Sequence, residues 1–275
     1  MKWILIVLAV IVVAAAAWYG LSGERACALN VVGSTSVQPF AEMLAEVYNQ
    51  QGSDCIVDVQ GGGSTAGLQA AANGIADIGM CSRSLKAEEE EKFTPIVIAR
   101  DGLAIVVHPT NSVDNLTREQ VRRMFAGEIA DWREVGGRPG PIRLITREEG
   151  SGTGEAFSKL VMDNQRIARR ALTQESNMAV KELVAHDPAA VGYMSLGLVG
   201  GLKTVRIDGV SPTVEHVIDG SYPLVRPFLF VTTGPPNPRA RKFIAFVLSA
   251  AGQALLEREG LVRAVDRPAA EGSSP

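Results

Sequence analysis

The sequence predicts an α/β fold in which short, parallel-paired strands alternate with helices. Three observations predict it. Short apolar runs that end in glycine alternate with segments whose apolar residues recur at helical spacing. Loops dense in Gly, Ser and Thr join three of the strands to the helices that follow them. The chain has 275 residues, of which 46% are hydrophobic and 21% charged, which suits one large or two mid-sized globular domains.

The first part of the chain gives the clearest alternation. An apolar run at residues 29–32 ends at Gly33, and a helix follows with Pro39 suited to its first turn. A second strand at residues 56–60 ends at three glycines, and the next helix leads to a third strand at residues 76–80. This βαβα order predicts parallel pairing of the three strands.

The remainder of the chain continues the alternation with less regular spacing. Thr117 and Gln120 form a capping-box pattern that predicts the start of a helix. Further strands are expected at residues 102–108, 143–146, 191–194 and 224–232, helices after 150–154 and at 177–185, one long last helix from Pro238 through Leu256, and a disordered Pro-, Ala- and Ser-rich tail at 266–275.

The N-terminal residues 1–28 are typical of a targeting or anchoring segment. Lys2 precedes an unbroken apolar run at residues 3–19, which is at the lower limit for spanning a bilayer and slightly longer than a usual signal-peptide core. Small-residue cleavage patterns at residues 15–17 and 26–28 leave a cleaved signal peptide and an uncleaved membrane anchor equally open. Either one places the folded part in the periplasm or otherwise outside the cytoplasm. A buried core helix is the remaining alternative.

Composition and motifs exclude several function classes. The formal net charge of −3 opposes a nucleic-acid-binding protein, which usually has a basic face. The sequence has neither a Gly-x-x-x-x-Gly-Lys-Ser/Thr nucleotide loop nor a Gly-x-Ser-x-Gly serine elbow. Its histidines, His108, His186 and His216, are spaced unlike metal ligands, so we expect no cofactor. The acidic run at residues 88–91 is expected to be a solvated helix face.

Three loops share a design that favours anion binding. They lie at residues 33–36, 63–65 and 150–153, and each follows a strand and precedes a helix. A helix N-terminus offers unpaired N–H groups and partial positive charge, hydroxyls add donors, and glycine lets the backbone approach a ligand. Arg147 precedes the third loop, and a guanidinium binds oxyanions in bidentate fashion. For any single loop the alternative is that Ser and Thr serve only as helix N-caps.

Four blocks in the same order carry a family resemblance. They are Gly33-Ser34-Thr35-Ser36-Val37-Gln38-Pro39, Gly61-Gly62-Gly63-Ser64-Thr65, Ala76-Asp77-Ile78-Gly79-Met80-Cys81-Ser82-Arg83 and Arg147-Glu148-Glu149-Gly150-Ser151-Gly152-Thr153. Together with residues 125–132 and 191–197, they resemble the shorter branch of the periplasmic phosphate-binding proteins of bacterial phosphate ABC transporters. The resemblance extends from about residue 29 to about residue 261.

The resemblance implies a two-lobed periplasmic-binding-protein fold of type II, with the ligand in the cleft between the lobes. One lobe would comprise residues 29–107 plus 222–265, and the other residues 108–221. The chain would be a monomer that binds inorganic phosphate, performs no catalysis and delivers the ligand to ABC permease subunits in the inner membrane. The positions that match the phosphate-binding residues of the family are Thr35, Ser36, Ser64, Arg147, Ser151, Gly152 and Thr153.

Two further contacts are expected beside Cys81. Ser82 stands where the longer branch of the family carries an aspartate that accepts the phosphate proton, and Arg83 follows it. Both are predicted ligand contacts, but the proton acceptor stays open. This matters because a carboxylate acceptor helps to separate protonated phosphate from sulfate, which has no proton to donate.

Three other functions stay open at this point. The same fold binds another oxyanion, such as sulfate, molybdate or tungstate. A hydrolase would use Ser64 or Ser151 as nucleophile and would need a base within reach, yet no histidine lies near either serine in sequence. An anchored protein would use phosphate only as a signal.

The three cysteines permit one disulfide in an oxidising compartment. Cys27 lies six residues before Gly33 and Cys55 six before Gly61, so two parallel strands in matched register would start with the cysteines side by side. We therefore predict a Cys27–Cys55 disulfide and a free Cys81 thiol. All three being unpaired is the alternative, and cleavage after Ala28 would remove Cys27.

Overall fold

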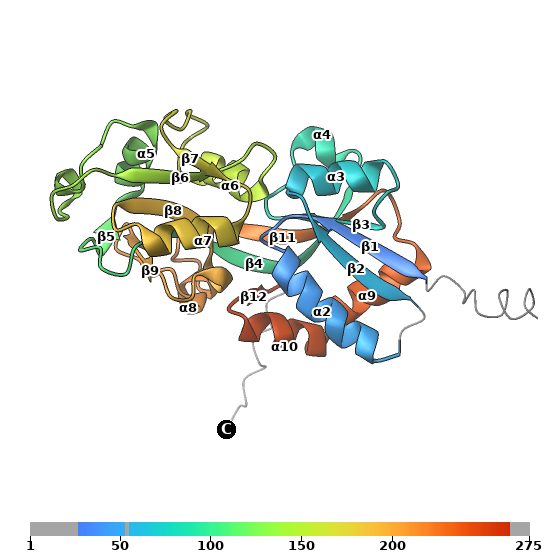
Figure 1. Cartoon of the computed structure of the whole chain (residues 1–275). Coiled ribbons are helices and arrows are strands. Elements are labelled where there is room, and N and C mark those ends of the chain that lie inside the picture. The colour runs from blue at the N-terminus through green and yellow to red at the C-terminus, as the bar shows by residue number, and fades with distance from the viewer. Residues whose placement is uncertain (1–26, 53–54, 265–275) are drawn as a thin grey trace, which may run out of the picture.

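The computed structural model describes residues 27–52 and 55–264, and these form two lobes that lie side by side (Figure 1). The predicted targeting segment and the tail lie outside the described residues. The first lobe combines the N-terminal strands with the last helices. Its elements are β1 (Ala28–Gly33), α2 (Gln38–Gln50), β2 (Ile56–Gly61), α3 (Ser64–Ala72), β3 (Ile78–Cys81), α4 (Ala87–Glu90), β4 (Thr94–Val107), β11 (Val225–Thr232), α9 (Pro238–Leu248), α10 (Ala250–Arg258) and β12 (Val262–Arg263).

The second lobe is built from the middle of the chain. Its elements are β5 (Asn115–Leu116), α5 (Arg118–Ala126), the 3-10 turn η1 (Trp132–Val135), β6 (Arg143–Arg147), α6 (Gly152–Leu160), β7 (Leu172–Gln174), α7 (Asn177–His186), β8 (Ala190–Ser195), the 3-10 turn η2 (Leu196–Leu198), β9 (Lys203–Thr204), β10 (Arg206–Ile207) and α8 (Val214–Ile218). None of the helices within the two described ranges is long and apolar enough to cross a bilayer.

A single mixed sheet runs through both lobes in the order β2-β1-β3-β11-β4-β8-β6-β7. β1 pairs in parallel with β2 and β3, as the βαβα order predicts. β4 pairs with β11 through residues 94–102 and with β8 through residues 103–107. This strand therefore passes from one lobe to the other, and the exact lobe boundaries at residues 107 and 222 stay a prediction.

Each lobe has its own hydrophobic core. In the first, alternate residues Leu29 and Val31 of β1 pack with Phe40 and Leu44, which lie four positions apart on one face of α2. In the second, Phe125, Phe157 and Tyr193 pack together, with the Phe157 and Tyr193 rings stacked at 3.9 Å between centroids. Residues from both halves of β4 enter these cores, so each core fixes one end of the strand that joins the lobes.

Local sequence signals predict the start of α5 correctly but miss a break near the C-terminus. The Thr117 hydroxyl accepts the Gln120 N–H, and the Gln120 side chain accepts the Thr117 N–H, so the predicted capping box is confirmed. The prediction of one long last helix is wrong, because two helices, α9 and α10, occupy this segment. Ser249 adopts an extended backbone, ends α9 and caps α10 by accepting the Gly252 N–H.

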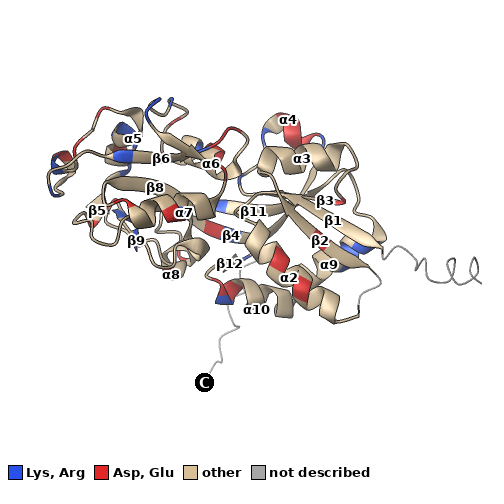
Figure 2. Cartoon of the chain, in the orientation of Figure 1, with Lys and Arg blue, Asp and Glu red and all other residues tan. Residues whose placement is uncertain are grey.

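The strand expected at residues 102–108 is only the second half of β4. The polar pair Arg100 and Asp101 interrupts the apolar pattern of this strand, although Asp101 is fully buried. Figure 2 shows an acidic band on β4 beside a basic band on β11 where the lobes meet, which corresponds to Asp101 paired with Arg226.

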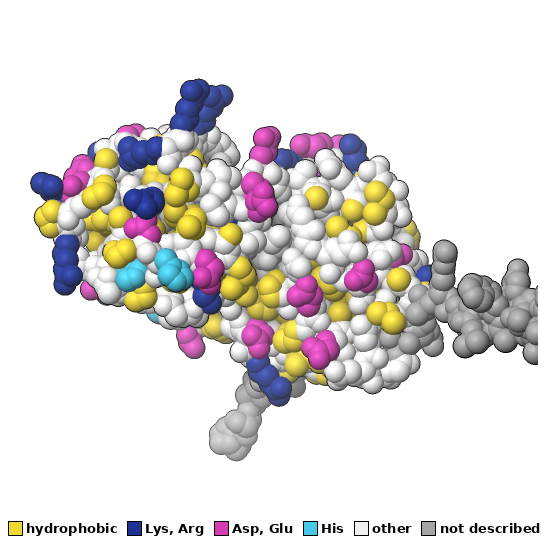
Figure 3. All heavy atoms as spheres, viewed as in Figure 1, with side chains coloured by type: hydrophobic (Ala, Val, Ile, Leu, Met, Phe, Trp, Pro, Cys, Tyr) yellow, Lys and Arg dark blue, Asp and Glu magenta, His cyan; other side chains and the backbone are white. Residues whose placement is uncertain are grey.

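In Figure 3 acidic side chains are spread over the lobe that carries α2, while most exposed basic side chains in this view lie on the other lobe.

Candidate functional site

Two of the Gly-Ser-Thr loops meet where the two lobes come together. The Ser36 hydroxyl, in the turn between β1 and α2, lies 2.6 Å from the Thr153 hydroxyl in the first turn of α6. Both residues are fully buried. The backbone at Gly33 has φ +145°, and a Cβ there would lie 2.3 Å from the Met80 carbonyl oxygen. Glycine is therefore required for the first loop to approach β3 so closely.

The second loop faces the same point from the N-terminus of α3. The Ser64 hydroxyl accepts the Ser82 N–H at 3.1 Å, and the two hydroxyl oxygens lie 3.4 Å apart. A Cβ on Gly152 would lie only 2.1 Å from the Ser64 Oγ. The N-termini of α6 and α3 can therefore approach this closely only because residue 152 has no side chain. Ser151 caps α6 by accepting the Gly154 N–H. The N-termini of two helices and four buried hydroxyls thus converge on one small volume.

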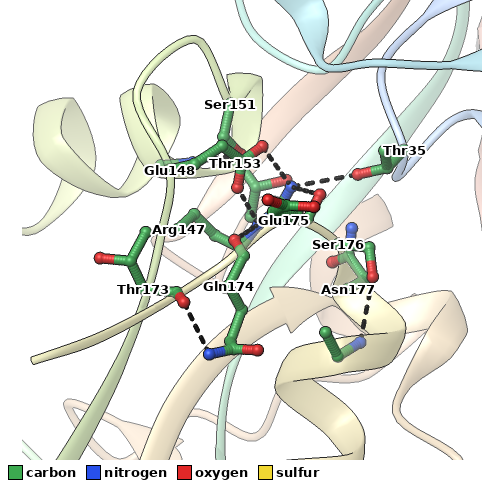
Figure 4. Close-up of polar contacts among 12 residues, drawn as sticks. Thr35, Arg147, Glu148, Ser151, Thr153, Thr173, Gln174, Glu175, Ser176 and Asn177 are labelled. Atoms are coloured by element: carbon green, nitrogen blue, oxygen red, sulfur yellow. Dashed lines mark hydrogen bonds and ion pairs between the residues drawn. The ribbon is translucent and has the colours of Figure 1, made fainter.

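Arg147 enters this volume from the end of β6 (Figure 4). Its Nε donates to Glu148 and to the Gln174 carbonyl, and its Nη2 donates to Glu148, to the Glu175 carbonyl and to the Thr35 hydroxyl at 3.1 Å. The Thr35 bond crosses from the second lobe to the first. The Nη1 atom is buried and has no hydrogen-bond partner among the described residues, so it is available to an anion.

The Arg83 guanidinium is held by two carboxylates. It donates to both carboxylate oxygens of Glu89, at 2.7 and 2.9 Å, and its Nε lies 3.1 Å from Glu155. Burial lowers the pKa of Arg83, but the hydrogen bonds to Glu89 and the neighbouring negative charges outweigh burial and raise it above its usual value. The acidic run is therefore not wholly a solvated helix face: that expectation is wrong for Glu89, which holds Arg83.

The structure adds four buried polar residues that the loop motifs do not contain. Asn177 begins α7, Ser195 ends β8, Asp101 lies in β4 and Arg226 in β11. Burial raises the pKa of Asp101, and the charge of Arg226 and the Ser195 hydroxyl oppose this rise. The signal that could have found two of them is an aspartate and an arginine, each inside an apolar strand.

The three histidines bond to residues other than the candidate nucleophilic serines. Residues His108, His186 and His216 bond to Thr110, to the Glu182 carbonyl, and to Ser211 and Thr213, rather than to Ser64 or Ser151. In the part of the chain that the structure describes, no group of three His, Cys, Asp or Glu side chains is placed to hold a metal ion.

Two of the three cysteines form a disulfide, and the third is a buried free thiol. Cys27 and Cys55 form a disulfide with their Cα atoms 4.5 Å apart. Ala28 lies opposite Ile56 in the parallel pairing of β1 and β2, which is the matched register from which the pairing is predicted. Cys81 is a buried free thiol next to Ser82, and burial raises its pKa. This thiol is therefore a poor nucleophile near neutral pH.

Comparison with known proteins gives a consistent result. A family model described as the PBP superfamily domain matches residues 21–251. The phosphate-binding protein PstS of Bacillus subtilis is 30% identical over 228 residues, covering 80% of this chain and 75% of that protein. PstS of Borreliella burgdorferi is 27% identical over 248 residues, covering 85% of this chain and 89% of that protein.

Solved structures are similar over most of the chain. A Clostridium perfringens protein, assigned as a phosphate ABC transporter substrate-binding protein and crystallised with bound phosphate, has a TM-score of 0.83 and 35% identity. The similarity covers 86% of this chain and 99% of that one. An ABC-type phosphate transport receptor from Vibrio cholerae has a TM-score of 0.73 and 38% identity, covering 85% and 99%.

Proposed function

This chain belongs to the PstS family of phosphate-binding proteins within the PBP superfamily, and we propose that it binds inorganic phosphate outside the cytoplasm and delivers it to an ABC transporter permease. The targeting segment at residues 1–28 supports the extracytoplasmic location, whether it is cleaved or kept as an anchor. The protein acts as a monomer and carries out no catalysis.

One observation carries the proposal. A buried guanidinium atom, the Nη1 of Arg147, has no partner among the described residues, and the same guanidinium bonds to Thr35, the neighbour of Ser36 in the loop that meets Thr153. A tetrahedral oxyanion accepts hydrogen bonds in several directions at once, and this set supplies donors from both lobes. The bound anion would therefore join the lobes.

The energetics favour tight binding. Charge-assisted hydrogen bonds contribute roughly 1.5–3 kcal/mol each. Several such bonds offset the dehydration of the anion and leave about −8 kcal/mol, or micromolar affinity or better. Thr35, Ser151 and Gly152 complete the proposed contact set, while Arg83 acts through Glu155 rather than on the ligand.

Isothermal titration calorimetry with phosphate, sulfate and molybdate tests the proposal. We expect micromolar or tighter binding of phosphate, and weaker binding of sulfate and molybdate. Equal or tighter binding of sulfate would assign the site to another oxyanion, since Ser82 stands where the longer branch has its proton-accepting aspartate. Absence of heat with all three anions would refute oxyanion capture.

The transport role needs a separate experiment. Cross-linking in cells, followed by purification of this protein, should recover ABC permease subunits. Recovery of a signalling partner without a permease would favour the phosphate sensor instead.

A further inference from the structure

Ser195 is the base of a buried polar network with two arms. Its backbone N–H donates to the Asn177 Oδ1 at 3.1 Å, and its hydroxyl donates to the Asp101 Oδ1 at 2.8 Å. All three residues are at most 1% exposed. The network begins where β8 ends against β4, which is the strand shared by both lobes. Buried polar groups in such a place need complete hydrogen bonding, so each bond constrains the next.

The first arm fixes the direction of an amide. A backbone N–H can only donate, so the Asn177 oxygen must face Ser195 and the Asn177 nitrogen must face the other way. That nitrogen donates to the Ser36 hydroxyl oxygen at 2.7 Å. The amide orientation therefore follows from the backbone, and the Ser36 oxygen is held as an acceptor toward α7.

The second arm fixes a guanidinium. The Asp101 Oδ2 accepts the Arg226 Nε at 3.0 Å and lies 2.9 Å from its Nη2. The Arg226 Nη1 donates to the Thr153 hydroxyl oxygen at 2.7 Å and to the Ser82 carbonyl at 3.2 Å. Because a guanidinium keeps its charge and has no acceptor, the Thr153 oxygen is also held as an acceptor toward β11.

The hydroxyl oxygens of Ser36 and Thr153 thus each accept a hydrogen bond from a group that can only donate. Their two protons are left to point toward each other across 2.6 Å or toward a ligand. Building on the proposed function, we infer that Ser195, Asn177, Asp101 and Arg226 are positioning residues that hold Ser36 and Thr153 as hydrogen-bond donors, so that the site selects the dianion of phosphate over the monoanion. The dianion has more oxygens that can only accept than the monoanion has, and its one remaining proton, which sulfate lacks, is left for an acceptor elsewhere in the site.

The charged groups around the site are already paired with one another. They are Arg147 with Glu148, Arg226 with Asp101, and Arg83 with Glu89 and Glu155, which also contacts Lys86. The buried Cys81 thiol faces the carbonyl of Arg83, and the side chain of Glu175 is exposed. These carboxylates are thus held by cations, so we expect the ligand proton to dominate the pH dependence of binding.

The test measures phosphate affinity by calorimetry between about pH 6 and about pH 8, where phosphate changes from monoanion toward dianion. For the full-length protein, affinity per total phosphate should fall toward tenfold per pH unit on the acidic side, as expected when one ligand proton must be lost. Asn177→Asp places a carboxylate oxygen against the Ser36 hydroxyl. The Ser36 proton then points to this carboxylate and away from the ligand. This variant should bind at least roughly tenfold more weakly near pH 8. Its affinity should also change by less than about threefold per pH unit.

Two further variants complete the design. Asn111→Asp adds the same charge in a turn where the Asn111 Oδ1 likewise accepts a backbone N–H, from Val113, and it should keep the wild-type affinity and slope. Ser195→Ala removes only the hydroxyl bond to Asp101, so it should weaken binding severalfold while the Asn177 arm and the pH slope persist. This variant keeps the inference testable if Asn177→Asp does not fold, as judged by thermal unfolding.

The outcomes separate the inference from the function on which it rests. Wild-type binding that is independent of pH, or an Asn177→Asp slope equal to that of wild type, would overturn the inference while leaving phosphate capture intact. Unchanged affinity in Ser195→Ala would likewise overturn the positioning role. Failure of the wild type to bind phosphate at any pH would remove both.

Discussion

Glu155 is expected to control affinity without touching the ligand. It lies in the first turn of α6, and its side chain bonds to three residues of the first lobe: Oε2 lies 3.1 Å from the Arg83 Nε and 2.9 Å from the Lys86 Nζ, and Oε1 accepts the Thr65 hydroxyl at 3.3 Å. These bonds join the two lobes and would be lost if the lobes separated. Glu155→Gln keeps the shape of the side chain and removes the charge that two cations share.

The magnitude follows from the exposure of the partners. The Lys86 side chain is 52% exposed, so this ion pair contributes at most about 1 kcal/mol. The Arg83 side chain is only 6% exposed, but it keeps its bidentate bond to Glu89, so the loss there is well below a full charge-assisted bond of about 1.5–3 kcal/mol. The contact between the lobes should therefore lose about 1–2 kcal/mol in total. Since about 1.4 kcal/mol is a tenfold change in affinity, the dissociation constant should rise by roughly five- to thirtyfold.

Stopped-flow and calorimetric measurements of phosphate binding test this prediction. The loss should appear mainly as faster dissociation, because the closed complex is what the ion pairs stabilise. Glu119→Gln is the matched control: it removes a carboxylate paired with Arg122 within α5, and it should leave affinity unchanged. An unaltered dissociation constant in Glu155→Gln, or an equal loss in the control, would refute the role of Glu155 in closure.

Four other outcomes follow from the structure. Gly152→Ala should abolish tight binding with little change in ligand-free melting temperature, because its Cβ would lie 2.1 Å from the Ser64 Oγ across the cleft; normal affinity would contradict the close approach. Arg147→Ala should weaken phosphate binding roughly thirtyfold or more, since removal of a buried hydrogen-bonded charge costs about 2–5 kcal/mol, and Arg147→Lys should recover only part; unchanged titrations would show that the site lies elsewhere. Phosphate should raise the melting temperature more than equimolar sulfate, with about 2.7 kcal/mol of stabilisation at a hundredfold excess over the dissociation constant, and equal shifts would indicate a general oxyanion site. Non-reducing peptide mapping should recover Cys27 linked to Cys55, and an alkylated free Cys27 peptide would rule the bridge out.

The sequence by itself determines what local chemistry specifies. Glycine, serine and threonine at the ends of strands predict anion-binding helix N-termini, and the Thr117–Gln120 capping box starts its helix without help from distant residues. The equal spacing of Cys27 and Cys55 from their strand-ending glycines predicts the register of β1 with β2. The order of the motifs likewise predicts the family, because that order reflects the fold as a whole.

Only the tertiary structure decides which side chains meet. Asn177 and Ser36 are 141 positions apart, and Arg226 and Asp101 are 125 apart, so no local pattern brings them together. Arg83 stands beside a predicted ligand loop in sequence, and the fold pairs its guanidinium with Glu89 and Glu155. The physical reason is that a buried charge goes to the partner that compensates its desolvation best, and the folded chain alone determines which partners are within reach.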